Sequence, residues 1–356
     1  MSLQNTINTA LSGWMKGTGP DADIVISSRI RLARNVEAVP FPHLMSESDG
    51  DKVLAGVRLA VAKPLAGKTG KLEFTILNQL STNERQILVE KHLISPQHAQ
   101  PGDYKAVVLS EDETVSVMVN EEDHLRIQCL LPGLQLREAW QRADKVDDLL
   151  EKTLDIAFCE PRGFLTACPT NAGTGMRASV MVHLPAMVMT NQMNRLIAAI
   201  TQVGLTVRGL YGEGSEAAGN LFQISNQITL GRGEEEILGN LAAVAKQIIN
   251  QERAAREMLL KSNREALEDK VSRSYGILRH ARIITSHEAI NLLSSIRLGI
   301  DLDIIKGVDG TVLNELMVLT RPAYLQKLSG TELSPGERDV RRATLIRERL
   351  AMFESK

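Results

Sequence analysis

The sequence predicts an α+β fold in which an antiparallel-sheet domain is followed by an all-α C-terminal domain. Segments with alternating apolar and polar residues come in neighbouring pairs joined by short turns, which is typical of antiparallel strands. Helical segments separate these pairs and do not follow every strand, so a doubly wound parallel sheet is not expected. Past about residue 232 only helical patterns remain.

The composition of the chain is that of an ordinary globular protein. Its 356 residues leave room for two domains, and 43% of them are hydrophobic. A net charge of -2 and 3% aromatic residues give no reason to expect direct nucleic-acid binding. Three unpatterned cysteines suggest neither a disulfide framework nor a zinc site. No signal peptide or membrane span is recognisable, so we expect a cytoplasmic protein without a membrane partner.

The first predicted strand, residues 23–35, separates apolar from basic side chains. Ile30 and Leu32 share one face, and Arg29 and Arg31 share the other. A solvated edge strand explains this pair of arginines as well as a binding site does. Further strands are predicted at residues 71–77, 104–109, 114–119, 125–131, 177–184, 205–210 and 221–230.

Predicted helices surround these strands and fill the rest of the chain. The segment 62–69 superficially resembles a phosphate-binding P-loop, but it lacks the preceding strand, so we predict a lysine-rich turn. We divide the chain into a lead-in (1–23), a sheet domain (24–254) and a helical domain (255–356). The helices are predicted at residues 46–63, 83–93, 134–151, 185–203, 234–263, 264–280, 286–296, 310–319 and from 334 onwards.

Two short segments carry reactive residue types. Residues 168–179 join a thiol, Cys168, through a glycine-rich turn to Arg177, with short strands expected on both sides. The alternative is a structural hairpin with a buried cysteine. Residues 120–124 form an acidic turn that contains Glu122, and a merely solvated turn explains it too.

Five arginines lie on predicted strands or beside acidic or glycine-rich turns. They come from four separate segments: Arg29, Arg31, Arg126, Arg177 and Arg208. Guanidinium groups suit multidentate phosphate recognition, so this set favours a triphosphate site built without a P-loop.

Four motifs, in order, give the chain a specific resemblance. Residues 26–31, 119–126, 168–178 and 207–209 resemble the phosphagen kinases, which phosphorylate a guanidino nitrogen. The match extends over about residues 24 to 254. The resemblance implies a phosphagen kinase catalytic domain that uses ATP, with Mg²⁺ carried by the nucleotide and no metal site of its own. It also implies that Glu122, Glu213 and Cys168 surround the acceptor guanidinium, where Cys168, as a thiolate, would contact and tune that group.

The resemblance further implies which residues bind ATP. They are Ser27, Ser28, Arg29, Ile30, Arg31, His92, Arg126, Arg177, Ala178, Ser179, Val180, Met181, Arg208, Gly209, Leu210, Tyr211, Gly212 and Glu213. His92, read without the resemblance, is simply a histidine on a helix face.

Departures from the small-molecule members indicate which branch of the family is nearest. The first motif begins at residue 24, so no N-terminal lid domain is expected, and Ala172 replaces the usual branched aliphatic residue. The added C-terminal helices resemble those of the bacterial branch that phosphorylates arginine in proteins. There the motif formed by Arg338, Asp339 and Arg342 binds phosphoarginine, although its spacing alone favours a charged amphipathic helix.

That branch implies a biological setting as well. Its members act in the stress response, form dimers, mark proteins for a Clp protease, phosphorylate the repressor CtsR and are activated by McsA. Two other hypotheses are a kinase for free arginine or another small guanidino compound, and a catalytically weak adaptor that binds phosphoarginine.

Overall fold

The computed structural model describes residues 3–62, 70–209, 217–307 and 310–354. Eight strands within these ranges form one antiparallel sheet in the order β2-β3-β4-β5-β1-β8-β10-β9, which confirms the predicted sheet type. The strands are β1 Val25–Arg34, β2 Leu72–Ile76, β3 Ala106–Ser110, β4 Val115–Val119, β5 Leu125–Pro132, β8 Met176–His183, β9 Leu205–Gly209 and β10 Leu221–Asn226. A separate hairpin pairs β6 Phe158–Cys159 with β7 Gly163–Phe164.

One face of the sheet is the main hydrophobic core. Ile30, Ile127 and Val180 point to this face from adjacent strands, and each is fully buried. They pack against helices that cover the same side: α2 Glu47–Val61, α4 Leu136–Glu151, α6 Met193–Gln202 and α7 Glu234–Ser262. Because side chains alternate along a strand, the residues between these positions must point to the opposite face.

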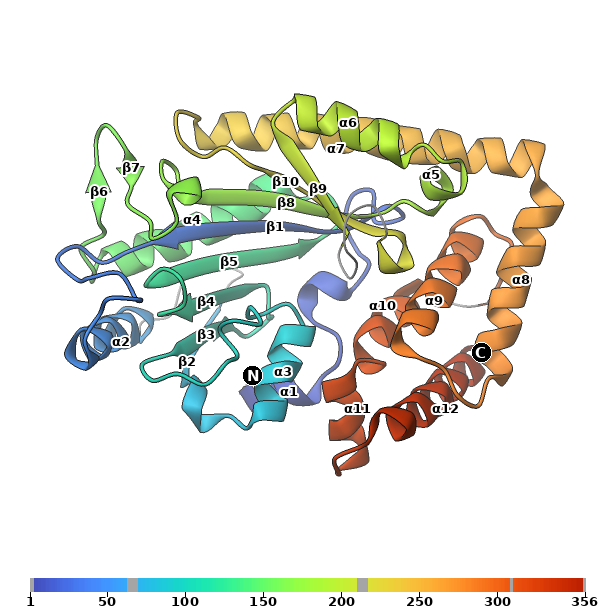
Figure 1. Ribbon diagram of the computed structural model, residues 1–356, viewed down its shortest axis with the longest axis horizontal. Coiled ribbons are helices and arrows are strands. Elements are labelled where there is room, and N and C mark those ends of the chain that lie inside the picture. The colour runs from blue at the N-terminus through green and yellow to red at the C-terminus, as the bar shows by residue number, and fades with distance from the viewer. Residues whose placement is uncertain (1–2, 63–69, 210–216, 308–309, 355–356) are drawn as a thin grey trace.

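The opposite face is only partly covered. A second apolar cluster joins Met118 and Leu130 of the sheet to Leu88 and Tyr324 of nearby helices. The helices here are α1 Leu3–Asn8, α3 Thr82–Glu90, α10 Gly310–Leu319 and α11 Pro322–Ser329. Figure 1 places α1 and α3 beside α11, so segments from both ends of the chain meet on this side of the sheet.

Helix α7 leads from the sheet into the C-terminal helices. It runs past residue 254 without a break, and α8 Arg264–His280 then descends to α9 Ser286–Asp301 and α12 Pro335–Glu354 (Figure 1). Within the described ranges no strand follows β10, as the sequence predicts. The division into domains near residue 255 stays a prediction, since one helix crosses that position.

Several element boundaries differ from the sequence predictions. The helix predicted at 185–203 is two helices, α5 Pro185–Met189 and α6, because Asn191 takes a left-handed conformation with φ 57°. Helix α3 ends at Glu90, so His92 lies in the turn that follows it. Helix α11 is not predicted by the sequence pattern. Residues 63–69, which hold most of the predicted lysine-rich turn, lie outside the described residues.

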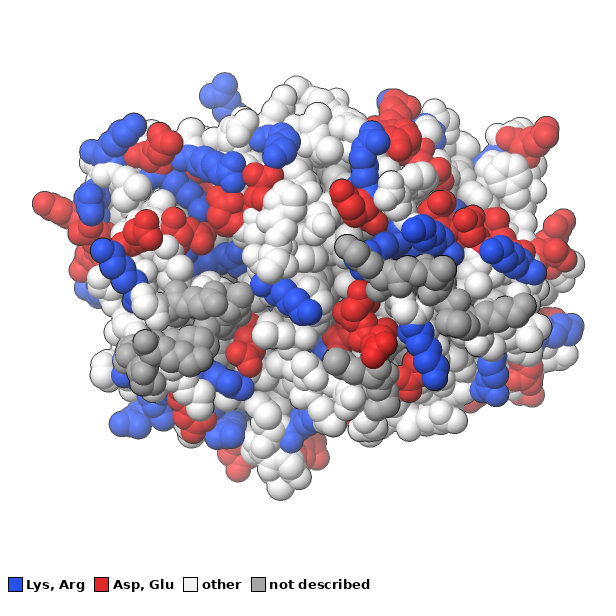
Figure 2. Space-filling model, turned by 180° about the vertical axis from the view of Figure 1, so that it is seen from behind, with Lys and Arg blue, Asp and Glu red and all other residues white. Residues whose placement is uncertain are grey.

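The outer surface carries both signs of charge. On the face drawn in Figure 2, the basic and acidic side chains of the described residues are interspersed. No helix in the described part of the chain is long and apolar enough to cross a membrane.

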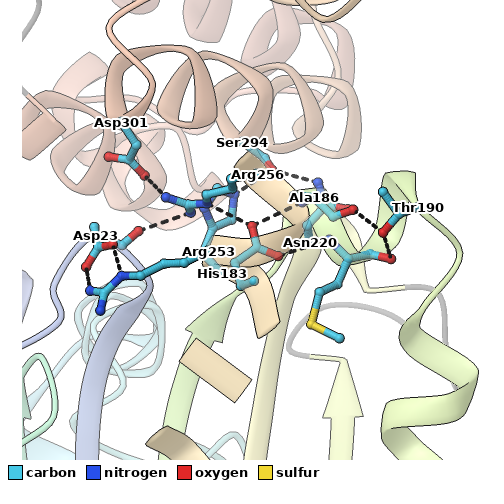
Figure 3. A network of polar contacts seen from close by, with 11 residues as sticks. Asp23, His183, Ala186, Thr190, Asn220, Arg253, Arg256, Ser294 and Asp301 are labelled. Atoms are coloured by element: carbon cyan, nitrogen blue, oxygen red, sulfur yellow. Dashed lines mark hydrogen bonds and ion pairs between the residues drawn. The ribbon is translucent and has the colours of Figure 1, made fainter. Parts of the chain in front are cut away.

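A buried ionic network ties α7 to its surroundings (Figure 3). Glu252, which is fully buried, accepts hydrogen bonds from the backbone N–H groups of Ala186 (3.1 Å) and Met187 (3.0 Å) at the start of α5. It also pairs with Arg256 at 2.9 Å, and Arg256 reaches Asp301 of α9 at 3.2 Å. One carboxylate therefore satisfies a helix terminus and an arginine that leads into the C-terminal helices.

Replacing Glu252 is expected to destabilise the fold strongly. Glu252→Ala leaves Arg256 partly unpaired and two N–H groups without acceptors, so the free energy of unfolding should fall by about 3–5 kcal/mol. Urea unfolding followed by circular dichroism measures this. The matched control is Glu257→Ala on the same helix, whose exposed pair with Lys261 spans 3.6 Å; it should change stability by less than about 0.5 kcal/mol. Equal effects of the two substitutions would contradict the role given to Glu252.

Candidate active site

The strand register brings all five predicted arginines to the partly covered face of the sheet. On β1, Arg31 lies directly opposite Arg177 of β8. Ala33, two residues further along β1 and therefore on the same face, lies opposite Arg126 of β5. Arg208 of β9 reaches the same face through its pairing with Gln223 of β10. Two arginines on one strand thus become part of a cationic surface to which four strands, β5, β1, β8 and β9, contribute arginines.

These arginines line two neighbouring hollows. The larger, of about 870 Å³, contains Arg29 and His92, and the smaller, of about 280 Å³, contains Cys168. The two hollows share three lining residues: Arg31, Glu122 and Arg126. A ligand in one hollow and a ligand in the other therefore meet at the same side chains.

The crowded guanidinium groups lower each other's affinity for protons. Burial lowers the pKa of Arg29 to about 10, and the charge of Arg126 adds to this. Burial, followed by the nearby guanidinium groups, lowers the pKa of Arg31 well below its usual value. The Nε atom of Arg31 is buried and has no hydrogen-bond partner among the described residues. Like charges and an unsatisfied donor at one point are what a bound polyanion would relieve.

His92 lines the larger hollow from a turn and not from a helix, which corrects the sequence prediction. It has a left-handed φ of 58°. Its ring meets the Trp14 ring edge-on, with 5.6 Å between the two ring centroids. Burial, and then the charges of Arg29 and Arg321, lowers the pKa of His92 to about 3. The imidazole is therefore neutral at pH 7, so it can accept a hydrogen bond or pack against a flat ligand.

The acidic turn that precedes β5 is not a solvated turn. Glu121 pairs with Arg126 at 2.6 Å and accepts a hydrogen bond from the Ser95 hydroxyl. Burial opposes ionisation, but the charge of Arg126 and the hydrogen bonds from Ser95 and Arg126 together outweigh it and lower the pKa of Glu121. Glu122 is exposed at the boundary of the two hollows. The sequence pattern did not distinguish these two adjacent carboxylates.

A buried hydrogen-bond network holds this turn against the Cys168 segment. The Asn35 side chain donates to Asp123 at 2.6 Å and accepts from the backbone N–H of His124 at 2.9 Å. Asp123 also accepts from the backbone N–H of Ala167 at 2.7 Å. Asp123 lies next to Glu122 in the chain, and Ala167 lies next to Cys168, so the network sets their relative position. Asn35 and Asp123 are not recognisable as partners from the sequence, since only the fold brings them together.

The Cys168 segment forms the turn that its glycines predict. Gly173 has φ 100°, and a Cβ there would lie 2.4 Å from the carbonyl oxygen of Thr229. The Cys168 sulfur lies 3.0 Å from the Thr170 hydroxyl, which accepts from Arg177 at 3.2 Å. Ala172 offers its carbonyl oxygen to the Thr229 hydroxyl at 2.6 Å. The thiol and the arginine are therefore linked through Thr170 on one wall of the smaller hollow.

Other predicted residues lie elsewhere in the fold. The side of the sheet that carries the five arginines, here called the arginine face, also carries Ser27, Ser179 and Met181. Four other predicted residues point to the opposite side, into the core: Ser28, Ile30, Ala178 and Val180. Gly209 ends β9. Residues Leu210, Tyr211, Gly212 and Glu213 lie outside the described residues.

The predicted phosphoarginine motif lies in the first turns of α12 and does not line either hollow. Arg342 is buried, and its guanidinium donates to the carbonyl oxygens of Thr320 (2.8 Å) and Ile284 (2.9 Å) and pairs with Asp339. Arg338 donates to the Leu333 carbonyl at 3.0 Å and is partly exposed. The two arginines therefore differ in how much of the guanidinium faces solvent.

The larger hollow is also lined by residues that no sequence motif indicates. Lys105, Gln223, Glu90 and Arg321 line it, and Arg321 comes from the C-terminal helices. Among the described residues, no group of three or more histidine, cysteine, aspartate or glutamate side chains is arranged to hold a metal ion.

Comparison with known proteins agrees with this geometry. Residues 53–255 match the ATP:guanido phosphotransferase C-terminal catalytic domain, and residues 264–356 match the protein-arginine kinase McsB C-terminal domain. The protein-arginine kinase of Desulforamulus reducens is 56% identical over 351 residues, or 98% of each chain. That of Moorella thermoacetica is 58% identical over 341 residues, covering 96% of this chain and 97% of the relative.

Solved structures show the same fold. A lombricine kinase superposes with a TM-score of 0.58 at 22% identity, covering 67% of this chain and 68% of that one. The duplicated taurocyamine kinase of Schistosoma mansoni superposes with a TM-score of 0.57 at 26% identity. The superposition covers 70% of this chain and 35% of that one. The chain is therefore an enzyme of the ATP:guanido phosphotransferase family. Within that family it belongs to the protein-arginine kinases.

Loss of the buried network under Glu122 and Cys168 should slow the reaction without weakening nucleotide binding. Asn35→Ala removes the bonds that align the two segments, so kcat for phosphotransfer should fall at least about tenfold. The KM for ATP should change less than about twofold, because the arginine face is untouched. Steady-state kinetics measures both. Asn78→Ala, which removes an exposed bond to Asp103, is the control and should leave kcat unchanged. An Asn35→Ala enzyme with normal kcat would remove this positioning role.

Proposed function

We propose that this protein transfers the γ-phosphoryl group of ATP to the guanidino group of arginine residues in other proteins. The observation that carries the proposal is the meeting of the two hollows at Arg31, Glu122 and Arg126. The larger hollow has a cationic lining that suits a polyphosphate, and the smaller one, beside Arg177 and Arg208, adds a carboxylate and a thiol for a cationic acceptor. Transfer between the two ligands needs this shared boundary.

In this proposal the arginine face binds and polarises the nucleotide. Phosphoryl transfer depends mainly on positioning and on neutralising the charge of the transferring group. Arg31 and Arg126 lie at the boundary, where that charge develops, and Arg29 lies farther along the larger hollow. Mg²⁺ enters with ATP as part of the substrate, and the implied residues that share the face of the arginines, such as Ser27 and Ser179, complete the nucleotide site.

The smaller hollow positions the acceptor. An arginine side chain is protonated in solution, so one N–H proton must leave as the N–P bond forms. Glu122 holds the guanidinium and accepts that proton, while the Cys168 sulfur contacts a second nitrogen and orients the group. Glu213, which lies beyond the described residues, is proposed as a second carboxylate. The thiol need not form a covalent intermediate.

A protein acceptor is favoured over free arginine by the relatives at 56–58% identity, which are named protein-arginine kinases. On the same ground we propose a cytoplasmic stress-response role in which phosphoarginine marks proteins for a Clp protease. CtsR would be a substrate, McsA an activator, and the enzyme a homodimer assembled through residues 255–356, beside a catalytic domain of residues 24–254.

The acceptor class can be tested directly. With Mg-ATP, the enzyme should place acid-labile phosphate on an arginine-rich protein and not on free arginine. Glu122→Gln and Cys168→Ala should each lower kcat by about 10²-fold or more, because each removes a group that touches the acceptor. Radiolabelled phosphate and mass spectrometry of the products measure this.

Cys159→Ala is the control, since Cys159 lies on β6 and does not line either hollow; it should keep full activity. If phosphate appears on free arginine alone, the proposal is wrong and the protein is a small-molecule kinase. Full activity of both site variants would contradict the assigned roles and favour the adaptor hypothesis.

We also propose that Arg338, Asp339 and Arg342 bind phosphoarginine and allow it to regulate the enzyme allosterically. Because the Arg342 guanidinium is held by two backbone carbonyls and Asp339, its part is to shape the site. Arg338 is the more open of the two, near the N-terminal end of α12, where an anion is favoured. It therefore makes the direct phosphate contact.

The two arginines should respond differently to substitution. Arg338→Ala should weaken binding of free phosphoarginine at least about tenfold and leave the thermal midpoint unchanged, because it removes a charge-assisted contact but little packing. Arg342→Ala should lower the thermal midpoint, because it leaves buried carbonyl groups without donors. Calorimetry and thermal unfolding measure these effects, with Arg341→Ala as the neighbouring control. Unchanged affinity in Arg338→Ala would exclude it as the phosphate contact.

A further inference from the structure

The larger hollow has two chemically different ends. Three of its residues, Arg31, Glu122 and Arg126, also line the Cys168 hollow, whereas His92 and Arg321 line the larger one only. If the γ-phosphoryl group is transferred to an acceptor beside Cys168, as proposed above, it must lie at the shared end. The adenosine half of the nucleotide then extends into the rest of the larger hollow, whose lining includes His92 and Arg321. This step rests on the proposed function.

The corner between α10 and α11 reaches this far end. Glu90, the last residue of α3, accepts hydrogen bonds from the backbone N–H groups of Ala323 (2.9 Å) and Tyr324 (3.2 Å) in the first turn of α11. The Asn83 side chain donates to the Ala323 carbonyl at 3.2 Å. The start of α11 is therefore fastened to the helix that ends beside His92.

The same corner is held from the other side. Arg342 of α12 donates to the carbonyl oxygen of Thr320 at 2.8 Å. Tyr324 is buried, and its hydroxyl donates to the Thr9 carbonyl at 2.7 Å. Arg321 thus extends from a short backbone segment whose neighbours on both sides are fixed, so its side chain begins at a defined place on the wall of the hollow.

The charge of Arg321 acts on groups of the hollow. It lowers the pKa of His92, after burial and Arg29, and it opposes the effect of burial on Glu90. Burial nevertheless raises the pKa of Glu90 to about 7. Arg321 therefore lies near both an imidazole that is neutral at pH 7 and the carboxyl group that anchors α11.

We propose that Arg321 is a nucleotide-binding residue that contacts the adenosine half of ATP, so that the C-terminal helices complete the nucleotide site. A planar guanidinium stacks on an aromatic base and donates hydrogen bonds to ribose hydroxyl groups. Neutral His92 supplies a second flat group at the same end of the hollow. The sheet residues bind the phosphates, and the helical region holds the base and sugar.

Direct binding measurements on the full-length protein test this assignment. ADP is one probe, and inorganic tripolyphosphate, which lacks adenosine, is the other. Arg321→Ala should weaken ADP binding about 5- to 30-fold in calorimetry and leave tripolyphosphate affinity unchanged. The KM for ATP should rise by a similar factor, and kcat at saturating ATP should stay close to that of the unmodified enzyme.

Two further variants make the result decisive. Arg321→Lys keeps the charge but loses the planar guanidinium, so it should weaken ADP binding several-fold, and it carries the test if Arg321→Ala does not fold. Arg349→Ala is the matched control, because Arg349 pairs with Glu315 at 3.2 Å without lining the hollow. It should leave ADP binding unchanged.

Two outcomes overturn the proposal. One is unchanged ADP affinity in folded Arg321→Ala or Arg321→Lys. The other is an equal loss of ADP and tripolyphosphate affinity, which would assign Arg321 to the phosphates. Neither binding measurement requires phosphoryl transfer, so failure of this inference is distinguishable from failure of the proposed function, which the acceptor assay tests.

Discussion

The repulsion between guanidinium groups on one face of the sheet is the constraint on which the site depends. Antiparallel pairing places Arg31 directly opposite Arg177, with Arg126 on the adjoining strand. Such a surface is unfavourable by itself: burial, and after it the charges of neighbouring guanidinium groups, lowers the pKa values of Arg29 and Arg31. The opposite face of the same strands offsets this cost, because Ile30, Ile127 and Val180 are fully buried against helices. One set of strands thus stabilises the fold and pre-organises an anion site.

Three adjacent acidic residues, Glu121, Glu122 and Asp123, make different contacts in the site. Glu121 is drawn into the cationic surface by Arg126, so it offsets part of the repulsion there. Glu122, one residue on, is exposed towards the hollow that contains Cys168. Asp123, the third in the row, is buried and fixes the turn to Asn35 and Ala167. The three adjacent acidic residues therefore have three different roles, because their side chains have different surroundings.

The sequence predicted the sheet well because alternation along a strand is a local property. The alternation of Arg29 and Arg31 with Ile30 and Leu32 is confirmed by the strand faces. Pairing between strands is not local, so the opposition of Arg31 and Arg177 was beyond the sequence. The helix prediction around His92 was wrong, since periodicity does not locate the left-handed turn that ends α3. Glu90 and Arg321 gave no signal, because their place in the hollow depends on α11 packing against α3.

The attachment of the C-terminal helices to the sheet explains how a distant segment can hold part of the hollow in register. Glu252 and Arg256 connect α7 to α5 and α9 through buried ionic contacts. Glu90 connects α3 to α11 at a second, separate place. A body held at one place could pivot, whereas contacts at separate places, which also include Asn314 with Met15 and Arg297 with Ala22, restrict rotation as well as translation. Because the second point lies at the rim of the hollow, the position of the α10–α11 corner is defined relative to the arginine face. A change at the Glu90 attachment would therefore act first on the larger hollow, which Glu90 lines, and not on the hollow that contains Cys168.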